Sequence, residues 1–169
     1  STDEFRVDIL ESLRWLGIDW DEGIDVGGPI ETYRQSERLA RYQEVVAEMV
    51  AAGKAYYSFA TPDQLDAFRK EALAAGESPA YDGRFEPDAD VAAQRVAAGE
   101  SATVRFRVPR PGETRFEDVV RETVVFDHKQ VEDFVILRSN GTPTYHLAST
   151  VDDVDFKISH VIRGEDLLS

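Results

Sequence analysis

The spacing of apolar residues changes along the chain, and this change most constrains how it can fold. Up to about residue 98, most apolar side chains recur every three or four residues, which is the period of an amphipathic helix. From Thr103 onward Val104, Phe106 and Val108 alternate with polar residues, which is the period of a strand. A chain that carries both patterns has to pack helices against a sheet, so the sequence predicts a mixed α/β fold.

The predicted elements follow from this spacing and from their flanking residues. Ser36 is expected to cap the second helix, Gly53 to end it, and Thr61, Pro62 and Gln64 to begin the third. Helices are predicted over residues 3–16, 36–53, 61–75, 88–98 and 144–151. Strands are predicted over residues 55–59, 103–108, 123–126, 133–137 and 158–162. This order predicts an α/β lobe that is interrupted by an α+β insertion of about 80 residues.

Charge and composition exclude several classes of protein. The 169 residues hold 19 Lys and Arg against 33 Asp and Glu, a net charge of −14, which disfavours a general nucleic-acid coat or a membrane-surface protein. The chain has no cysteine, so it has no disulfide, thiolate metal site or cysteine nucleophile. No apolar run approaches the roughly 20 residues that a spanning helix needs. We therefore expect a cytoplasmic protein without a membrane partner.

Few residues stand out as chemical groups by themselves. Neither a P-loop nor a Gly-x-Gly-x-x-Gly element is present, and the three histidines lack metal-ligand spacing. Asp152, Asp153 and Asp155 could bind a hard cation, but a solvated acidic face is the favoured interpretation. Arg163 follows a predicted strand, where it could hold a carboxylate or phosphate, or could pair with a nearby acid.

A local group of arginines opposes the acidic net charge. Its members are Arg105, Arg107, Arg110 and Arg115. Such a patch can attract a phosphate backbone even on an acidic chain. The alternative, favoured on these residues alone, is a solvated face of the sheet.

Several longer runs closely resemble the catalytic region of bacterial glutamyl-tRNA synthetases. They are ILESLRWLGIDWDEG at 9–23, VGGP at 26–29, YRQSER at 33–38, YDGR at 81–84, DFVILRS at 133–139, GTPTYHLA at 141–148 and HVIRGED at 160–166. The matches occur in order and cover nearly the whole chain.

The resemblance implies a class I aminoacyl-tRNA synthetase with a partial Rossmann-type catalytic domain. Residues 1–58 and 141–169 would belong to that domain, and residues 59–140 would be the inserted connective domain that meets the tRNA acceptor stem. Glutamate, ATP with Mg²⁺, and tRNA(Glu) are the implied substrates, and the protein is expected to be a monomer. Tyr145, Ser149 and Arg163 would contact glutamate, Asp166 would lie near ATP, and Arg105 and Arg107 are candidates for tRNA contact.

Departures from the family pattern qualify this interpretation. The His-Ile-Gly-His and Lys-Met-Ser-Lys-Ser signatures are absent, so we expect a fragment that holds no catalytic residue and does not activate glutamate alone. Many members bind zinc through Cys-x-Cys and Tyr-x-x-x-Cys; here Ser58, Ala60, Tyr81 and Phe85 stand at those positions, and we expect no metal. Ser149 replaces an Asn that is frequent in relatives. The alternatives are a non-catalytic tRNA- or protein-binding module and a glutamyl-queuosine tRNA(Asp) synthetase.

Overall fold

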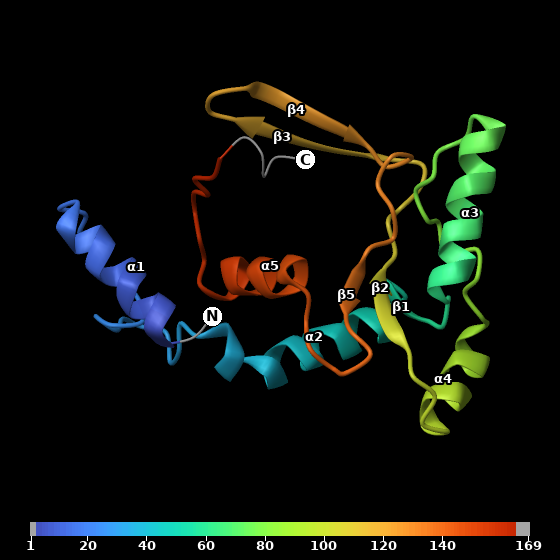
Figure 1. Cartoon of the computed structure of the whole chain (residues 1–169), viewed down its shortest axis with the longest axis horizontal. Helices are drawn as coiled ribbons and strands as arrows, with labels where there is room; N and C mark the ends of the chain where they lie inside the picture. Colours follow the sequence, from blue (N-terminus) through green and yellow to red (C-terminus); the bar gives the residue numbers. More distant parts are fainter. Residues whose placement is uncertain (1–2, 165–169) are drawn as a thin grey trace. The chain divides into compact units, whose positions relative to one another are not determined.

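A computed structural model describes residues 3–164 of the chain (Figure 1). It contains two compact units, residues 1–38 and residues 39–169. Among the described residues, no helix is both long and apolar enough to cross a membrane.

The described part of the first unit consists of an α-helix, an irregular loop and a short 3-10 helix. Helix α1 spans Asp3–Trp15 and buries none of its residues. It ends as predicted at Gly17, whose φ of 73° is left-handed and whose N–H donates to the carbonyl of Arg14 at 2.9 Å. The loop that follows is held by Asp25, which accepts a hydrogen bond from Trp20 Nε1 at 2.9 Å and pairs with Arg14.

The start of the second helix differs from the prediction. Ser36 does not cap it, because residues Gln35–Glu37 form a separate short 3-10 helix, η1. Helix α2 then spans Leu39–Ala51. The chain leaves it at Gly53, which has a φ of 69°, so the predicted end is confirmed.

As far as residue 164, the rest of the second unit holds five strands and three more helices. In chain order they are β1 (Ala55–Ser58), α3 (Pro62–Ala75), α4 (Ala89–Ala97), β2 (Thr103–Phe106), β3 (Glu113–Asp118), β4 (Glu122–Asp127), β5 (Val135–Leu137) and α5 (Tyr145–Asp155). The predicted capping box of α3 is present, because the Thr61 side chain accepts from Gln64 N while Gln64 Oε1 accepts from Thr61 N.

The strands form two separate antiparallel arrangements. β2 lies between β1 and β5 in a three-stranded sheet, and β3 pairs with β4 in a hairpin. β3 was not predicted, because Glu113, Arg115, Glu117 and Asp118 leave it with little apolar alternation. A hairpin exposed on both sides lacks the buried face that makes a strand visible in a sequence.

Helices cover both faces of the three-stranded sheet (Figure 1). Because side chains alternate along a strand, Ala55 packs with α2 and α5 while its neighbour Tyr56 packs with α3. The first core contains Tyr42, Val46, Ala55, Val104, Ile136, Leu147, Ala148 and Val151, and the second contains Tyr56, Phe68, Ala72 and Tyr81. The side of β2 that faces the second core is therefore covered by protein and is not exposed to water.

The predicted last strand is wrong. Residues 158–162 are irregular, and Ile162 is 97% exposed. A strand needs a neighbour to pair with its backbone N–H and C=O groups, and no strand among residues 3–164 pairs with this segment.

Candidate functional site

The connection from β5 to α5 positions the predicted substrate residues. Gly141, with a φ of 78°, closes a turn by donating its N–H to the Arg138 carbonyl at 2.9 Å. Thr144 then donates its N–H to the Ile136 carbonyl at 2.9 Å and its hydroxyl to the Val135 carbonyl at 3.0 Å. These bonds join the start of α5 to the end of β5. The Thr144 hydroxyl is thereby used on the sheet and does not cap the helix.

Arg163 and Tyr145 lie together at this end of α5. The guanidinium carbon of Arg163 is 5.8 Å from the centre of the Tyr145 ring. The 11 residues of α5 make it about 16 Å long, and Figure 1 shows that the chain turns away from the helix axis after its last residue. The two long side chains, and not the backbone, therefore bring these residues together. Both side chains are exposed. An arginine held over an aromatic ring can present its planar fork of donors to a carboxylate.

The other two predicted substrate residues are placed less directly. Ser149 is half-buried and follows Tyr145 by one helical turn, so both residues lie on the same side of α5. Asp166 lies outside the described residues. The structure therefore brings together Tyr145 and Arg163, and it places Ser149 on the same face of α5 as Tyr145.

Two acidic residues that the sequence offers as cation ligands, Asp152 and Asp155, connect α5 to α2. Asp152 is 7% exposed and accepts hydrogen bonds from the Tyr42 hydroxyl at 2.9 and 3.0 Å. Asp155 accepts from Nε and Nη2 of Arg41, both at 3.1 Å, and this bonding raises the pKa of Arg41 above its ordinary value. Within residues 3–164, no group of three or more acidic or histidine side chains could hold a metal ion. Asp152 and Asp155 therefore position the helix.

The arginines at 105–115 do not form one exposed patch. Arg105 is only 7% exposed; it donates from Nη1 to the Asp133 carbonyl, and its guanidinium carbon lies 4.8 Å from the centre of the Tyr81 ring. Because α3 covers this face of the sheet, the Arg105 guanidinium is not available to a phosphate. The sequence pattern predicts a solvated or phosphate-binding face for Arg105, and the structure buries this residue instead.

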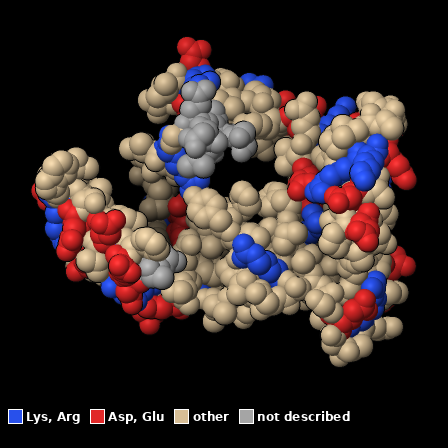
Figure 2. All heavy atoms as spheres, in the orientation of Figure 1, with Lys and Arg blue, Asp and Glu red and all other residues tan. Residues whose placement is uncertain are grey.

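The three remaining arginines of the group are each paired with a carboxylate. Arg107 pairs with Glu86 and Arg115 with Glu113, while Arg110 pairs with Asp133 at 2.7 Å. The side chain of Arg107 is 44% exposed, so it can still meet a ligand at the surface. Figure 2 shows acidic and basic side chains interspersed at the right of the view, where Figure 1 places α3 and α4.

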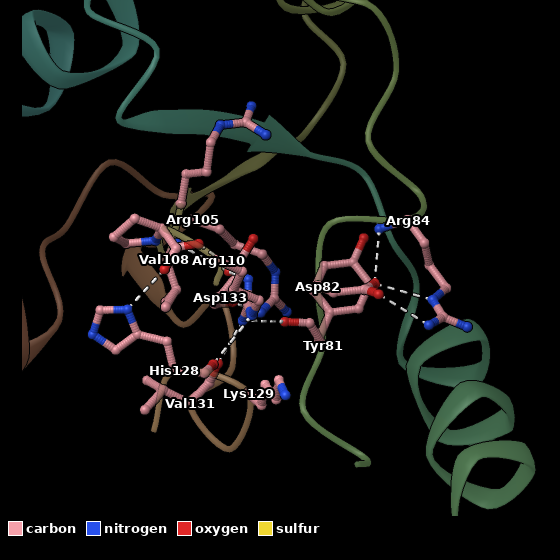
Figure 3. A network of polar contacts seen from close by, with 12 residues as sticks. Tyr81, Asp82, Arg84, Arg105, Val108, Arg110, His128, Lys129, Val131 and Asp133 are labelled. Atoms are coloured by element: carbon pink, nitrogen blue, oxygen red, sulfur yellow. Dashed lines mark hydrogen bonds and ion pairs between the residues drawn. The ribbon is translucent and has the colours of Figure 1, made fainter. Parts of the chain in front are cut away.

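Asp133 is the centre of a buried polar network (Figure 3). Its side chain is 1% exposed and accepts from the Tyr56 hydroxyl at 3.0 Å and from Val108 N at 3.1 Å, besides Arg110. Arg110 also donates to the carbonyls of His128 and Val131. These contacts join β1, the β2–β3 connection and the segment before β5. Burial, followed by the nearby Asp133 charge, raises the pKa of Tyr56 well above its ordinary value.

The histidines have structural or surface positions. His128 is 9% exposed, with Nδ1 2.7 Å from the Pro109 carbonyl and Nε2 2.8 Å from the Thr114 hydroxyl. His146 is exposed and contacts the rings of Phe134 and Tyr145 edge-on. His160 is exposed and bonds to Ser159.

The loop of the first unit encloses an open hollow of about 380 Å³. Its lining residues are Gly23, Ile24, Gly27, Gly28, Ile30, Glu31, Thr32, Tyr33, Arg34 and Glu37. Gly28 suits this position, because its φ of 148° would strain a residue with a Cβ, and that Cβ would lie 2.1 Å from the Tyr33 hydroxyl. The lining carries both acidic and basic groups, so its charge selects neither an anion nor a cation.

Comparison with known proteins assigns this arrangement to a family. The sequence model for the catalytic domain of class I tRNA synthetases (E and Q) matches residues 1–169. The chain is 50% identical over 171 residues to Glutamate–tRNA ligase 2 of Rubrobacter xylanophilus, covering 100% of this chain and 34% of that protein. It is 47% identical over 169 residues to the glutamate–tRNA ligase of Acinetobacter baumannii (strain AYE), covering 99% and 34%. The chain thus spans about a third of the length of the curated relatives that it matches.

Solved structures agree with the sequence comparison. A glutamate tRNA ligase from Elizabethkingia meningosepticum, crystallised in complex with its amino acid, superposes with a TM-score of 0.82 at 34% identity, covering 95% of this chain and 34% of that one. The glutamate-tRNA synthetase of Elizabethkingia anophelis gives the same values. The fold is therefore that of a class I tRNA synthetase catalytic domain. Within that class, the chain belongs to the glutamate and glutamine family.

Sequence reasoning did not identify the Asp133 network. One observation could have indicated it: Asp133 is a carboxylate that directly precedes the apolar run Phe134–Leu137. A charge at the start of a buried strand needs partners of opposite charge. The arginines upstream were available for this, but the sequence does not show which of them is close.

Proposed function

We propose that this chain is the central part of the catalytic region of a glutamate–tRNA ligase. The observation that carries the proposal is the match to such ligases over the whole chain, at up to 50% identity among the relatives above. The contact between Arg163 and Tyr145 supports it, because it supplies a group that can bind a carboxylate at the end of α5.

The reaction of the whole enzyme would have two steps. The α-carboxylate of glutamate attacks the α-phosphate of ATP, giving glutamyl-adenylate and pyrophosphate. A ribose hydroxyl at the 3′ end of tRNA(Glu) then attacks the activated carbonyl, and AMP leaves. This chemistry depends chiefly on positioning and charge stabilisation, which suits a segment that contributes no nucleophile or general base.

In this proposal the chain supplies contacts to glutamate. Arg163 grips a carboxylate, the ring of Tyr145 fixes the guanidinium from one side, and Ser149 offers a hydroxyl one turn along the helix. Asp166 would lie near ATP. The phosphates and the accompanying Mg²⁺ would be held mostly by residues elsewhere in the enzyme, because the chain carries neither ATP signature.

We propose further that residues 59–140 are the connective domain that meets the tRNA acceptor stem, with residues 1–58 and 141–169 belonging to the catalytic domain. Arg107 is the better supported of the two candidate tRNA contacts, because it is half-exposed whereas Arg105 is buried. The first unit is a poor surface for phosphates, since residues 1–38 hold ten carboxylates and four arginines. A zinc-free, monomeric and cytoplasmic enzyme completes the proposal.

The test is glutamate-dependent exchange of pyrophosphate into ATP, measured with tRNA(Glu) present. We expect none from the 169-residue chain alone and clear exchange from the full-length protein that carries it. The full-length protein should charge tRNA(Glu), and charging of tRNA(Gln) and tRNA(Asp) in parallel would define its specificity. Glutamylation of tRNA(Asp) alone would support the queuosine-type enzyme, and no exchange by the full-length protein would support a binding module.

A further inference from the structure

Four positions that hold zinc in many members of the family do not fit a metal here. Ser58, Ala60, Tyr81 and Phe85 stand at them, and Ala60 and Phe85 have no donor atom in their side chains. Structural zinc takes four ligands, mainly thiolates and imidazoles. The hydroxyl of Tyr81 is also engaged, because it accepts a hydrogen bond from Phe85 N at 3.2 Å.

Charge opposes a metal at the same place. The guanidinium carbon of Arg105 lies 4.8 Å from the centre of the Tyr81 ring, and the side chain is buried. A divalent cation beside this guanidinium would be repelled strongly in a region of low dielectric constant. Thiolates would offset that repulsion, but the chain has no cysteine.

Aromatic packing fills the region instead. Tyr81 is 1% exposed, and its ring meets Phe68 of α3 edge-on, with centroids 6.0 Å apart and an angle of 77°. Phe85 stacks on Tyr81, with centroids 5.8 Å apart and an angle of 29°. The ring of Tyr81 therefore has Phe68 and Phe85 as aromatic neighbours and the Arg105 guanidinium over its face.

We propose that these four residues, Phe68, Tyr81, Phe85 and Arg105, form an aromatic clasp that takes the structural place of the metal. The clasp fastens the loop around residues 81–86 to α3 through Phe68 and to β2 through Arg105. The Tyr81 carbonyl extends the attachment toward β5 by accepting from Asp133 N at 2.8 Å. A zinc ion would fasten the same loop through its ligands, but to residues 58–60 instead of to α3 and β2.

Side chains provide the clasp, so it needs no cofactor and no reduced thiol. The fold around residues 58–60 and 81–86 should then be insensitive to chelators and to thiol oxidants. Its strength should depend instead on the Tyr81 hydroxyl and on the Phe85 ring. This inference concerns how the fold is held and is independent of the proposed activity.

The first experiment measures metal dependence in the 169-residue chain. Purified protein should contain less than about a tenth of a zinc ion per chain by elemental analysis, and its Tm should be unchanged by EDTA or by added ZnCl₂. Zinc bound at one ion per chain, or a fall in Tm with EDTA, would overturn the proposal.

The second experiment locates the clasp by amide hydrogen exchange. In Tyr81→Phe the amide of Phe85 loses its acceptor, and its exchange should accelerate about tenfold, as expected for one lost hydrogen bond. In Phe85→Ala, exchange should accelerate at Glu86, whose N–H donates to the Gly83 carbonyl at 2.8 Å. Because both variants keep Phe68 and Arg105 in place, they test the loop without removing the whole second core.

Phe116→Ala is the matched control. Phe116 is 38% exposed and stacks on Phe126, much as Phe85 is 37% exposed and stacks on Tyr81, but it lies in the β3–β4 hairpin. It should leave exchange at 81–86 unchanged. Equal exchange at 81–86 in Phe85→Ala and in the unsubstituted chain would refute the clasp, as would equal acceleration in Phe116→Ala.

Discussion

The Arg163 guanidinium lies over the ring of Tyr145, with 5.8 Å between the guanidinium carbon and the ring centre, although one residue begins α5 and the other follows its far end. A turn follows α5. Ile158 N donates to the Asp153 carbonyl at 2.9 Å, and the chain turns away from the helix axis there (Figure 1). The two predicted glutamate ligands thus meet although the whole of α5 lies between them in the sequence.

Arg163→Ala should raise the KM for glutamate in the full-length protein by at least ~30-fold, because a charge-assisted pair with a carboxylate contributes about 2 kcal/mol or more. Arg163→Lys keeps the charge but loses the planar fork, so it should recover only part of the affinity. Exchange of pyrophosphate at varied glutamate concentration, with tRNA(Glu) present, measures both.

Arg69→Ala is the control for charge removal, since Arg69 is an exposed residue of α3 that pairs with Asp66 and Glu132. It should leave the KM for glutamate unchanged. An Arg163→Ala enzyme with the unsubstituted KM would contradict the assignment.

Local sequence predicted most elements of this fold well. The end of α1 at Gly17 and the capping box of α3 are formed by residues within a few positions of one another, so the sequence contains all that is needed. The predicted strand at 158–162 is wrong because a strand depends on more than its own residues. Its apolar alternation is correct for a strand, but a strand requires a partner that the described residues do not supply.

The candidate site was only partly predictable for a similar reason. Resemblance to the family indicated Tyr145 and Arg163 but gave no geometry between them. Alternation along the strand correctly predicts that Arg105 and Val104 point to opposite faces of the sheet. It does not show that α3 covers the face that carries Arg105. An arginine can bind a ligand or be buried in the core, and the outcome depends on how distant elements pack together. The alternation of residues along one strand does not contain that information.

Arg105 and Arg107 should therefore respond differently to substitution. Arg107→Ala in the full-length protein should weaken tRNA binding and reduce the slope of log K against log salt by about 1, as for one lost phosphate contact. Arg105→Ala should mainly lower the free energy of unfolding, because it removes a buried group that contacts Tyr81 and the Asp133 carbonyl. Binding at several salt concentrations, together with urea unfolding, separates the two effects. An unchanged salt slope in Arg107→Ala would show that Arg107 only pairs with Glu86.

Asp133→Asn should lower the free energy of unfolding by about 3 kcal/mol, because it leaves Arg110 without its buried counter-charge. Urea unfolding of the 169-residue chain gives the value. Asp82→Asn is the control, since Asp82 pairs with Arg84 in an exposed position and its loss should cost less than about 1 kcal/mol. Equal effects of the two substitutions would show that the Asp133 network adds nothing beyond a surface pair.

Lys157→Gly should stabilise the chain by about 0.5 to 1 kcal/mol. Lys157 has a φ of 57° at the turn that follows α5, a conformation that costs a residue with a Cβ but not glycine. Lys157→Ala removes the long side chain but keeps the Cβ, so it should give no such gain. Thermal unfolding of the unsubstituted chain and the two variants compares their stabilities. An equal gain in stability in Lys157→Ala and Lys157→Gly would assign the effect to loss of the lysine side chain instead.

Helix α1 should be far less protected than α2 from amide hydrogen exchange in the 169-residue chain. α1 buries none of its residues, and Phe5 and Trp15 are 61% and 86% exposed, whereas α2 buries Tyr42 and Val46. An isolated helix of 13 residues is only marginally stable in water, so α1 lacks the packing that protects α2. Exchange followed by peptide-resolved mass spectrometry should show α1 deuterated at early times and the centre of α2 only late. In the full-length protein, slower exchange of α1 would show that its apolar side chains are covered by other parts of the polypeptide, while equally slow exchange of α1 and α2 in the 169-residue chain would contradict the prediction.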